Sequence, residues 1–297
     1  MTMQRKHRLV FTALWAISLL VWWRPLVNTF SISVDNNEYT YLLLIFPISA
    51  TFLFLERRSW WDASEWSFRL APIVLGAGAV LAMYARYWAI ASSGDVQLAL
   101  EMSSLVLLWI GIFALCFGAV ASESALFSLV FLFGLVPLPE NVLNFIIALL
   151  QEGSAWSAHA LFTLFAVPVV QQGNFLTIPG LTIQVAQECS SIRSSSMLFV
   201  TTIVLVQVLL RSPWRKAMIV GFAVPLSVAK NGLRIFTIAM LGTRVDPGYL
   251  TGRLHHQGGI LFFAIAIAGI FALLAVCRRG EEAALEASRV PLGLNAN

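Results

Sequence analysis

Long apolar runs alternate with short polar clusters along almost the whole chain, and this alternation predicts a membrane protein. A membrane-spanning helix needs about 20 largely apolar residues. Runs of about this length are found at 9–27, 39–55, 70–91, 98–117, 119–136, 190–210, 218–241 and 258–277. We therefore expect an all-α polytopic membrane protein with about eight transmembrane helices, forming a single integral membrane domain over residues 1–297.

Residues 137–187, between the fifth and sixth predicted helices, lack such a run. In 141–165 apolar residues recur at helical spacing between polar ones, which favours a helix lying in the outer membrane interface. The β-prone runs 169–178 and 181–185 meet at the turn dipeptide Pro179-Gly180, which predicts a short β-hairpin. The expected order is thus the N-terminal helices 1–136, the outer interfacial segment 137–187, the helices bearing the polar sites 188–277 and a cytoplasmic tail 278–297.

Basic residues gather on one side of the predicted membrane. All their clusters fall on that side if the helix count is even and both termini are cytoplasmic, as the positive-inside rule requires. Residues 140–188 contain no lysine or arginine, so this stretch is assigned to the outer side. The clusters are Arg5, Lys6 and Arg8; Arg57, Arg58 and Arg69; Arg211, Arg215 and Lys216; Arg278 and Arg279.

The composition excludes a soluble enzyme with a single anchor. Of the 297 residues 59% are hydrophobic and only 11% are charged, against about 25% charged in soluble domains. The net charge of +4 does not indicate a nucleic-acid partner, because the charges lie in short clusters between apolar runs. The basic start resembles a signal peptide, but bulky Trp22-Trp23 follows the first apolar run where cleavage needs small residues, which predicts a retained helix.

Cys189 lies where a polar segment, Gln187-Glu188-Cys189-Ser190-Ser191-Ile192-Arg193, meets a long apolar run. A cysteine is nucleophilic as its thiolate, and a helix N-terminus or a nearby cation favours that form. Arg193, one helical turn further on, makes a secondary candidate for stabilising the thiolate or contacting a substrate. Cys189 is therefore a candidate nucleophile, whereas Cys116 and Cys277 are interpreted as small apolar fillers.

Two further polar islands, 230–234 and 253–256, are predicted to reach the outer boundary. Arg234 follows the inner Arg215 by 19 residues, which at about 1.5 Å per helical residue nearly crosses the membrane. Asn231 shares the helix face of Arg234 and could orient it. His255 and His256 directly precede the last helix. The predicted topology thus brings a thiol, a guanidinium and an imidazole to one depth.

These side-chain types suit attack on a peptide carbonyl. A histidine can take the proton of the thiol and return one to the leaving amine, and an arginine can stabilise the oxyanion. Glu188 would raise the pKa of the Cys189 thiol if it came close. A zinc site from Cys189, His255 and His256, completed by Glu188 or water, is an alternative. We expect no cofactor and no metal, because the scattered cysteines form no CxxC motif and the chain has no HExxH.

At these residues the chain resembles the exosortase/archaeosortase family of polytopic membrane cysteine transpeptidases. The resemblance covers 136–263, in the segments VPLPENVLN, VPVVQQGNFLTIPGLTIQVAQECSSIRS, NGLRI and HHQGGILFF. The family usually has Ser-Gly-Leu-Arg after its cysteine, where this chain has Ser190-Ser191-Ile192-Arg193. Its histidine usually stands four residues before a glycine that opens an aromatic-rich helix, which selects His255 over His256 because Gly259 precedes Phe262-Phe263.

The resemblance implies an enzyme of the cytoplasmic (inner) membrane with its active site on the outer, periplasmic side. Its partners would be secreted proteins whose C-terminal sorting signal consists of a short motif such as Pro-Glu-Pro (PEP-CTERM-like), a transmembrane helix and a basic cluster. Cys189 would cleave this signal through a thioester, with His255 and Arg234 as the other catalytic residues. The thioester would pass to an acceptor amine or to water, and membrane lipid would surround the site.

An alternative from a different class is a non-catalytic transporter or scaffold in cell-envelope or exopolysaccharide assembly. Such a protein is expected to carry polar residues through the middle of its helices, lining a path. The sequence instead concentrates them at the predicted outer boundary, which favours the enzyme.

Overall fold

The computed structural model describes residues 3–57, 60, 71–87, 93–185, 192–250 and 259–289, and these are mostly helical. The chain forms two compact units, Met1–Leu143 and Asn144–Asn297. Four residues singled out from the sequence, Glu188, Cys189, His255 and His256, lie outside the described residues.

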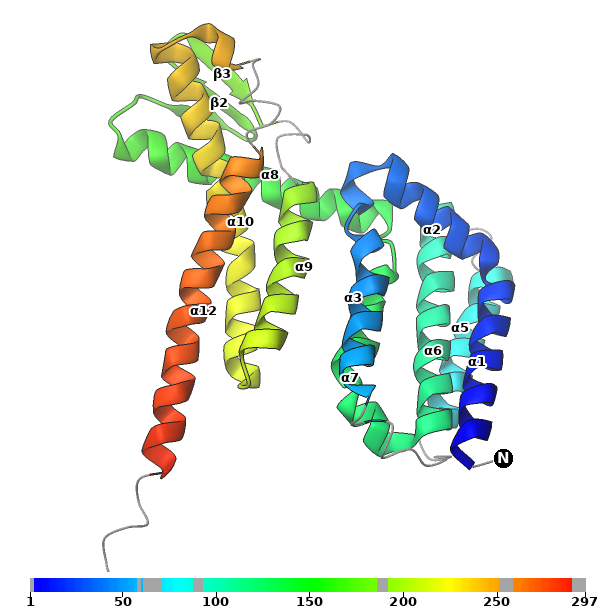
Figure 1. The fold of residues 1–297 in the computed structure, drawn as a ribbon. Helices are drawn as coiled ribbons and strands as arrows, with labels where there is room; N and C mark the ends of the chain where they lie inside the picture. Colours follow the sequence, from blue (N-terminus) through cyan, green and yellow to red (C-terminus); the bar gives the residue numbers. More distant parts are fainter. Residues whose placement is uncertain are drawn as a thin grey trace, which may run out of the picture. The chain divides into compact units, whose positions relative to one another are not determined.

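The described secondary structure of the first unit is helical, and the unit is built around α6 (Figure 1). Gly78 and Gly111 allow α5 and α6 to approach closely, since a Cβ at Gly111 would lie 2.7 Å from Cγ of Leu75. The rings of Phe11 and Phe117 pack edge to face beside this contact, with centroids 5.1 Å apart. The elements are α1 (Met3–Val21), α2 (Trp23–Asp35), η1 (Asn37–Tyr39), α3 (Leu42–Leu55), α5 (Ala71–Tyr87), α6 (Gly94–Ser124), α7 (Leu126–Phe131) and η3 (Leu132–Leu135).

In the second unit three long helices, α9 (Ile192–Leu209), α10 (Pro213–Arg244) and α12 (Gly259–Arg289), pack side by side (Figure 1). Leu198, Ile219 and Ile270, one from each helix, are fully buried in their shared core. The unit also holds most of α8 (Glu140–Leu164), the strands β1 (Val170–Gln172), β2 (Phe175–Ile178) and β3 (Leu181–Gln184), and the short η5 (Pro247–Leu250).

The turn between α9 and α10 is tied to α12. Glu281 accepts hydrogen bonds from the backbone N–H groups of Arg211 and Ser212, at 3.1 and 2.9 Å. Arg215 donates to the carbonyl oxygen of Cys277 at 3.0 Å, and its guanidinium lies 3.9 Å from the Glu281 carboxylate. The Glu281 carboxylate thus satisfies two backbone N–H groups where the chain reverses between two helices.

The small sheet has the order β1-β2-β3 with antiparallel neighbours. The predicted hairpin is present as β2 and β3, joined at Pro179-Gly180, where Gly180 has a φ of +84° that suits glycine. The run 169–178, expected as one strand, is divided by a second turn at Gly173, whose φ is +57°. Leu176 and Ile178 are buried against α8 and α10, so the sheet covers the ends of these helices.

The expected number of spans is not confirmed. Among the described residues 5 helices are long and apolar enough to cross a membrane, or up to 7 if each bent pair counts as one span. Five of the predicted spans correspond to these candidate membrane helices: those near 39–55, 98–117, 190–210, 218–241 and 258–277. The helix Ala71–Tyr87, in the predicted span 70–91, is apolar but shorter. The predicted span 119–136 divides, because α6 ends at Ser124 and α7 and η3 follow it.

The first predicted span, 9–27, is also broken, with a bend of 70° between Lys6–Val21 and Trp23–Asp35. Pro25 has no N–H with which to bond the carbonyl of Val21, four residues earlier, and such a proline kinks a helix. Arg86 donates to that carbonyl instead, at 3.0 Å. Hydrophobic patterning gives the right apolar stretch here but does not reveal its bend.

Candidate functional site

The stretch that contains Cys189 is attached at both ends to the packed second unit. On the N-terminal side Val185 is 1% exposed, its N–H donates to the carbonyl of Asn174 at 2.8 Å, and its carbonyl accepts from Gln151 of α8 at 3.2 Å. On the C-terminal side α9 begins at buried Ile192. The covalent chain therefore enters and leaves the Cys189 stretch at two fixed, buried positions.

Serines in the first turns of α9 contact α10 directly. Lys230 donates from Nζ to the hydroxyl oxygen of Ser194, and the hydroxyl of Ser227 donates to that of Ser195 at 2.6 Å. Lys230 is 6% exposed although it carries an ammonium group. The polar serines that the sequence places at the start of this helix therefore align it with the Lys230 turn of α10.

Asn231 and Gly232 set the position of α10 against α8. Asn231 is 1% exposed and donates from Nδ2 to the hydroxyl of Ser154 at 2.9 Å. At Gly232 a Cβ would lie 2.3 Å from Oγ of Ser157 and 2.9 Å from the backbone nitrogen of Ala158, so the helices touch at this residue. Asn231, expected to orient Arg234, thus lies in the contact that fixes the helix bearing Arg234.

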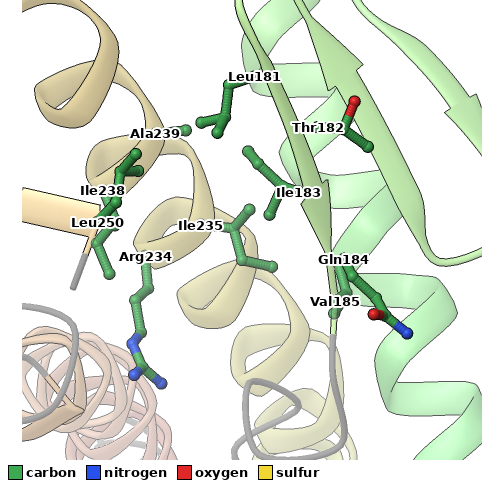
Figure 2. A pocket seen from close by; sticks show the side chains of 10 residues that line it. All are labelled: Leu181, Thr182, Ile183, Gln184, Val185, Arg234, Ile235, Ile238, Ala239 and Leu250. Carbon is green, nitrogen blue, oxygen red and sulfur yellow. The ribbon is translucent and has the colours of Figure 1, made fainter. Parts of the chain in front are cut away.

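Arg234 lines a pocket of about 150 Å³ between α10 and the sheet. Figure 2 shows its guanidinium at one end of the pocket and the β3 side chains across from α10. Apart from Arg234, the walls formed by α10 and η5 are apolar, from Ile235, Ile238, Ala239 and Leu250. The opposite wall is the whole of β3 with Val185, the residue after it.

Not every predicted site residue can be placed. Arg234 and Asn231 lie on neighbouring turns of α10, and Arg193 lies exposed in the first turn of α9. The convergence of Cys189 and His255 with Arg234 stays a prediction, because Cys189 and His255 lie outside the described residues. The zinc alternative stays untested for the same reason, and the described residues hold no group of three or more His, Cys, Asp or Glu that could bind a metal.

Lys230 is the polar residue of this site whose position the sequence did not reveal. It lies one helical turn before Arg234 and donates to the hydroxyl of Ser194 in α9. The sequence signal for this contact was a lysine inside a largely apolar helix, together with a serine-rich start of the preceding helix. Two cationic side chains thus lie on successive turns of α10, and one of them, Arg234, lines the apolar pocket. A guanidinium at such a pocket favours the stabilisation of negative charge.

Comparison with known proteins points to a family. The sequence pattern of a family described as transmembrane exosortase matches residues 22–272, which include α2 through the N-terminal part of α12 and every candidate site residue. No curated protein and no solved structure matches the chain significantly.

Proposed function

Because the chain belongs to the transmembrane exosortase family, we propose that it is a membrane cysteine protease or transpeptidase with Cys189 as its nucleophile. Its substrates would be secreted proteins with a C-terminal sorting signal of the PEP-CTERM type. The observation that carries the proposal is the pocket that joins Arg234 to β3, the strand after which the chain runs on to Cys189. Arg234, the proposed oxyanion donor, thus lines one apolar recess together with the strand that precedes the proposed nucleophile.

In the proposed reaction the Cys189 thiolate attacks the scissile carbonyl after His255 has taken the thiol proton. Arg234 donates hydrogen bonds to the oxyanion of the tetrahedral intermediate. His255 returns the proton to the leaving amine as the C–N bond breaks, which leaves a thioester on Cys189. An acceptor amine or water then attacks the thioester and releases the thiolate. His256 is the alternative imidazole.

The neighbouring residues take supporting roles in this proposal. Asn231 keeps α10 against α8 through Ser154, so it holds the helix from which Arg234 extends. Arg193, exposed in the first turn of α9, would stabilise the thiolate or contact the substrate. Glu188, directly before the nucleophile, would oppose thiolate formation if its carboxylate came close.

The proposed membrane placement puts the reaction at the outer face of the cytoplasmic membrane, with both termini inside. It is supported by the multi-pass apolar helices and by the basic clusters around Arg57, Arg215 and Arg278. The substrate's own apolar helix would lie in the bilayer beside the enzyme, with its basic end inside. Its scissile bond would then stand at the outer boundary.

The proposal is tested by co-expressing the full chain with a secreted protein that bears a motif, apolar helix and basic tail. We expect Cys189→Ala to leave this substrate at its full-length mass, whereas the unmodified enzyme shortens it. Cys277→Ala is the matched control, because Cys277 is buried within α12 and packs in the core that this helix shares with α9 and α10. Normal processing by Cys189→Ala would remove Cys189 from the nucleophile role.

A further inference from the structure

In the part of the chain that the structure describes, β3 is an edge strand beside the site. Among the described residues the sheet order β1-β2-β3 gives β3 one hydrogen-bonded neighbour, β2. A strand edge carries a row of backbone donors and acceptors that matches another extended chain. Resting on the proposed function, we infer that this edge binds the extended peptide segment of the substrate next to its scissile bond.

The register identifies which backbone groups of β3 point outward. Residues that face each other in an antiparallel pair alternate between hydrogen-bonded and non-bonded positions. Val185 donates to the carbonyl of Asn174, so this pair is bonded, and so are the pairs two and four residues further along, which contain Ile183 and Leu181. Thr182 and Gln184 are therefore the non-bonded positions, and their N–H and C=O groups point away from β2.

These outward groups face the pocket. It is lined by five consecutive residues, Leu181 to Val185, although alternate side chains of a strand lie on opposite faces of a sheet. An unbroken run of lining residues means that the pocket opens on the edge of the strand and not on one face alone. α10 forms the opposite wall, with Arg234 at one end (Figure 2).

An extended peptide matches both parts of this surface, the backbone edge of β3 and the apolar recess beside α10. Its backbone would pair with Thr182 and Gln184, and one of its apolar side chains would enter the recess between Ile235, Ile238 and Leu250. A dry cavity of about 150 Å³ elsewhere accommodates a benzene-sized ligand, so this one takes a single apolar side chain. Cys189 follows Val185 by four residues, which reach at most about 14 Å, so a peptide on this edge lies within reach of the proposed nucleophile.

Proline substitution tests this edge with a matched control on the same sheet. Gln184→Pro removes an N–H that points outward and leaves the hydrogen bonds to β2 intact. Edge strands tolerate proline at such positions. The control is Gln171→Pro in β1, whose register with β2 likewise points its N–H outward, but at the opposite edge. We expect Gln184→Pro to lower the rate of substrate processing at least about tenfold relative to Gln171→Pro, as loss of an irreplaceable backbone hydrogen bond requires.

A second measurement does not depend on the proline variants folding. A photoreactive benzoylphenylalanine at Thr182 is expected to cross-link to the co-expressed substrate on irradiation, and the same residue at Gln171 is not. Equal processing by the two proline variants, equal cross-linking from both positions, or cross-linking from Thr182 only to lipid or to a second copy of the enzyme overturns the inference. If the unmodified enzyme leaves the substrate intact, the proposed function itself fails, which is a separate result.

Discussion

The contact between α8 and α10 at Gly232 predicts a large response to a single methyl group. In Gly232→Ala the new Cβ would stand 2.5 Å from Cβ of Ser157 and 2.9 Å from the backbone nitrogen of Ala158. Rotation of the serine side chain moves its hydroxyl but cannot move either of these atoms. The helices must therefore separate, which costs about 1–3 kcal/mol of unfolding free energy, as overpacking does in other cores.

Gly221→Ala provides the control on the same helix. Gly221 has no atom within 4 Å of an added Cβ, so this substitution is expected to be neutral or to stabilise α10 by up to about 1 kcal/mol. The assay is thermal unfolding of the detergent-solubilised protein, in which each kcal/mol corresponds to roughly 2–4 °C in Tm. Ser157→Gly removes the Cβ that the introduced methyl group meets, so adding it to Gly232→Ala should recover part of the loss, measured as a coupling in the double-mutant cycle.

In Gly232→Ala we expect the processing rate to fall by more than the loss of unfolding free energy explains. Arg234 lies two residues beyond Gly232, so separation of the helices moves its guanidinium, and a displacement of about 1 Å can cost about 100-fold in rate. Processing measured well below the Tm of the variant isolates this effect. If Gly232→Ala and Gly221→Ala share one Tm and one processing rate, the close contact of α8 and α10 does not hold and the reasoning from it is wrong.

Two further predictions concern the cations of α10. Arg234→Lys keeps the charge but loses the forked donors, so we expect the processing rate to fall by about 100-fold or more with Tm nearly unchanged. Processing at the normal rate would exclude Arg234 as the oxyanion donor. Lys230→Met replaces a buried ammonium, which donates to the neutral hydroxyl of Ser194, by an apolar side chain of similar length. Among the described residues no carboxylate forms an ion pair with Lys230, and burying a charge without an opposite charge is costly. We therefore expect an unchanged or higher Tm, and a Tm lower by more than a few degrees would contradict this account of the Lys230 environment.

The parts of the fold that depend on local chemistry could be predicted from the sequence. Pro179-Gly180 specifies the turn between β2 and β3 by its own conformational preferences. The helix expected over 141–165 corresponds to α8 (Glu140–Leu164), and the last expected span continues as α12 to Arg289. In each case the signal is a periodic pattern or a turn residue within the element itself.

Features that depend on which surfaces of the fold contact each other could not be predicted from the sequence. The bend beside Pro25 is completed by Arg86, which is distant in the sequence, and the apolar pattern of residues 9–27 is the same whether the helix is straight or bent. The pairing of Lys230 with Ser194 requires knowing which faces of α9 and α10 touch. At the site, Arg234 was found from its depth in a predicted helix, whereas the edge of β3 that lines the same pocket becomes evident only from the register of the sheet.

The attachment of Glu281 to the α9–α10 turn has a consequence for biosynthesis. The ribosome makes α12 after the two helices that it ties together, so the N–H groups of Arg211 and Ser212 remain hydrated until Glu281 arrives. A chain stalled before Glu281 would thus lack these two hydrogen bonds and the Arg215–Glu281 ion pair at the α9–α10 turn. The contacts that join the α9–α10 turn to α12 can therefore form only after α12 has been synthesised.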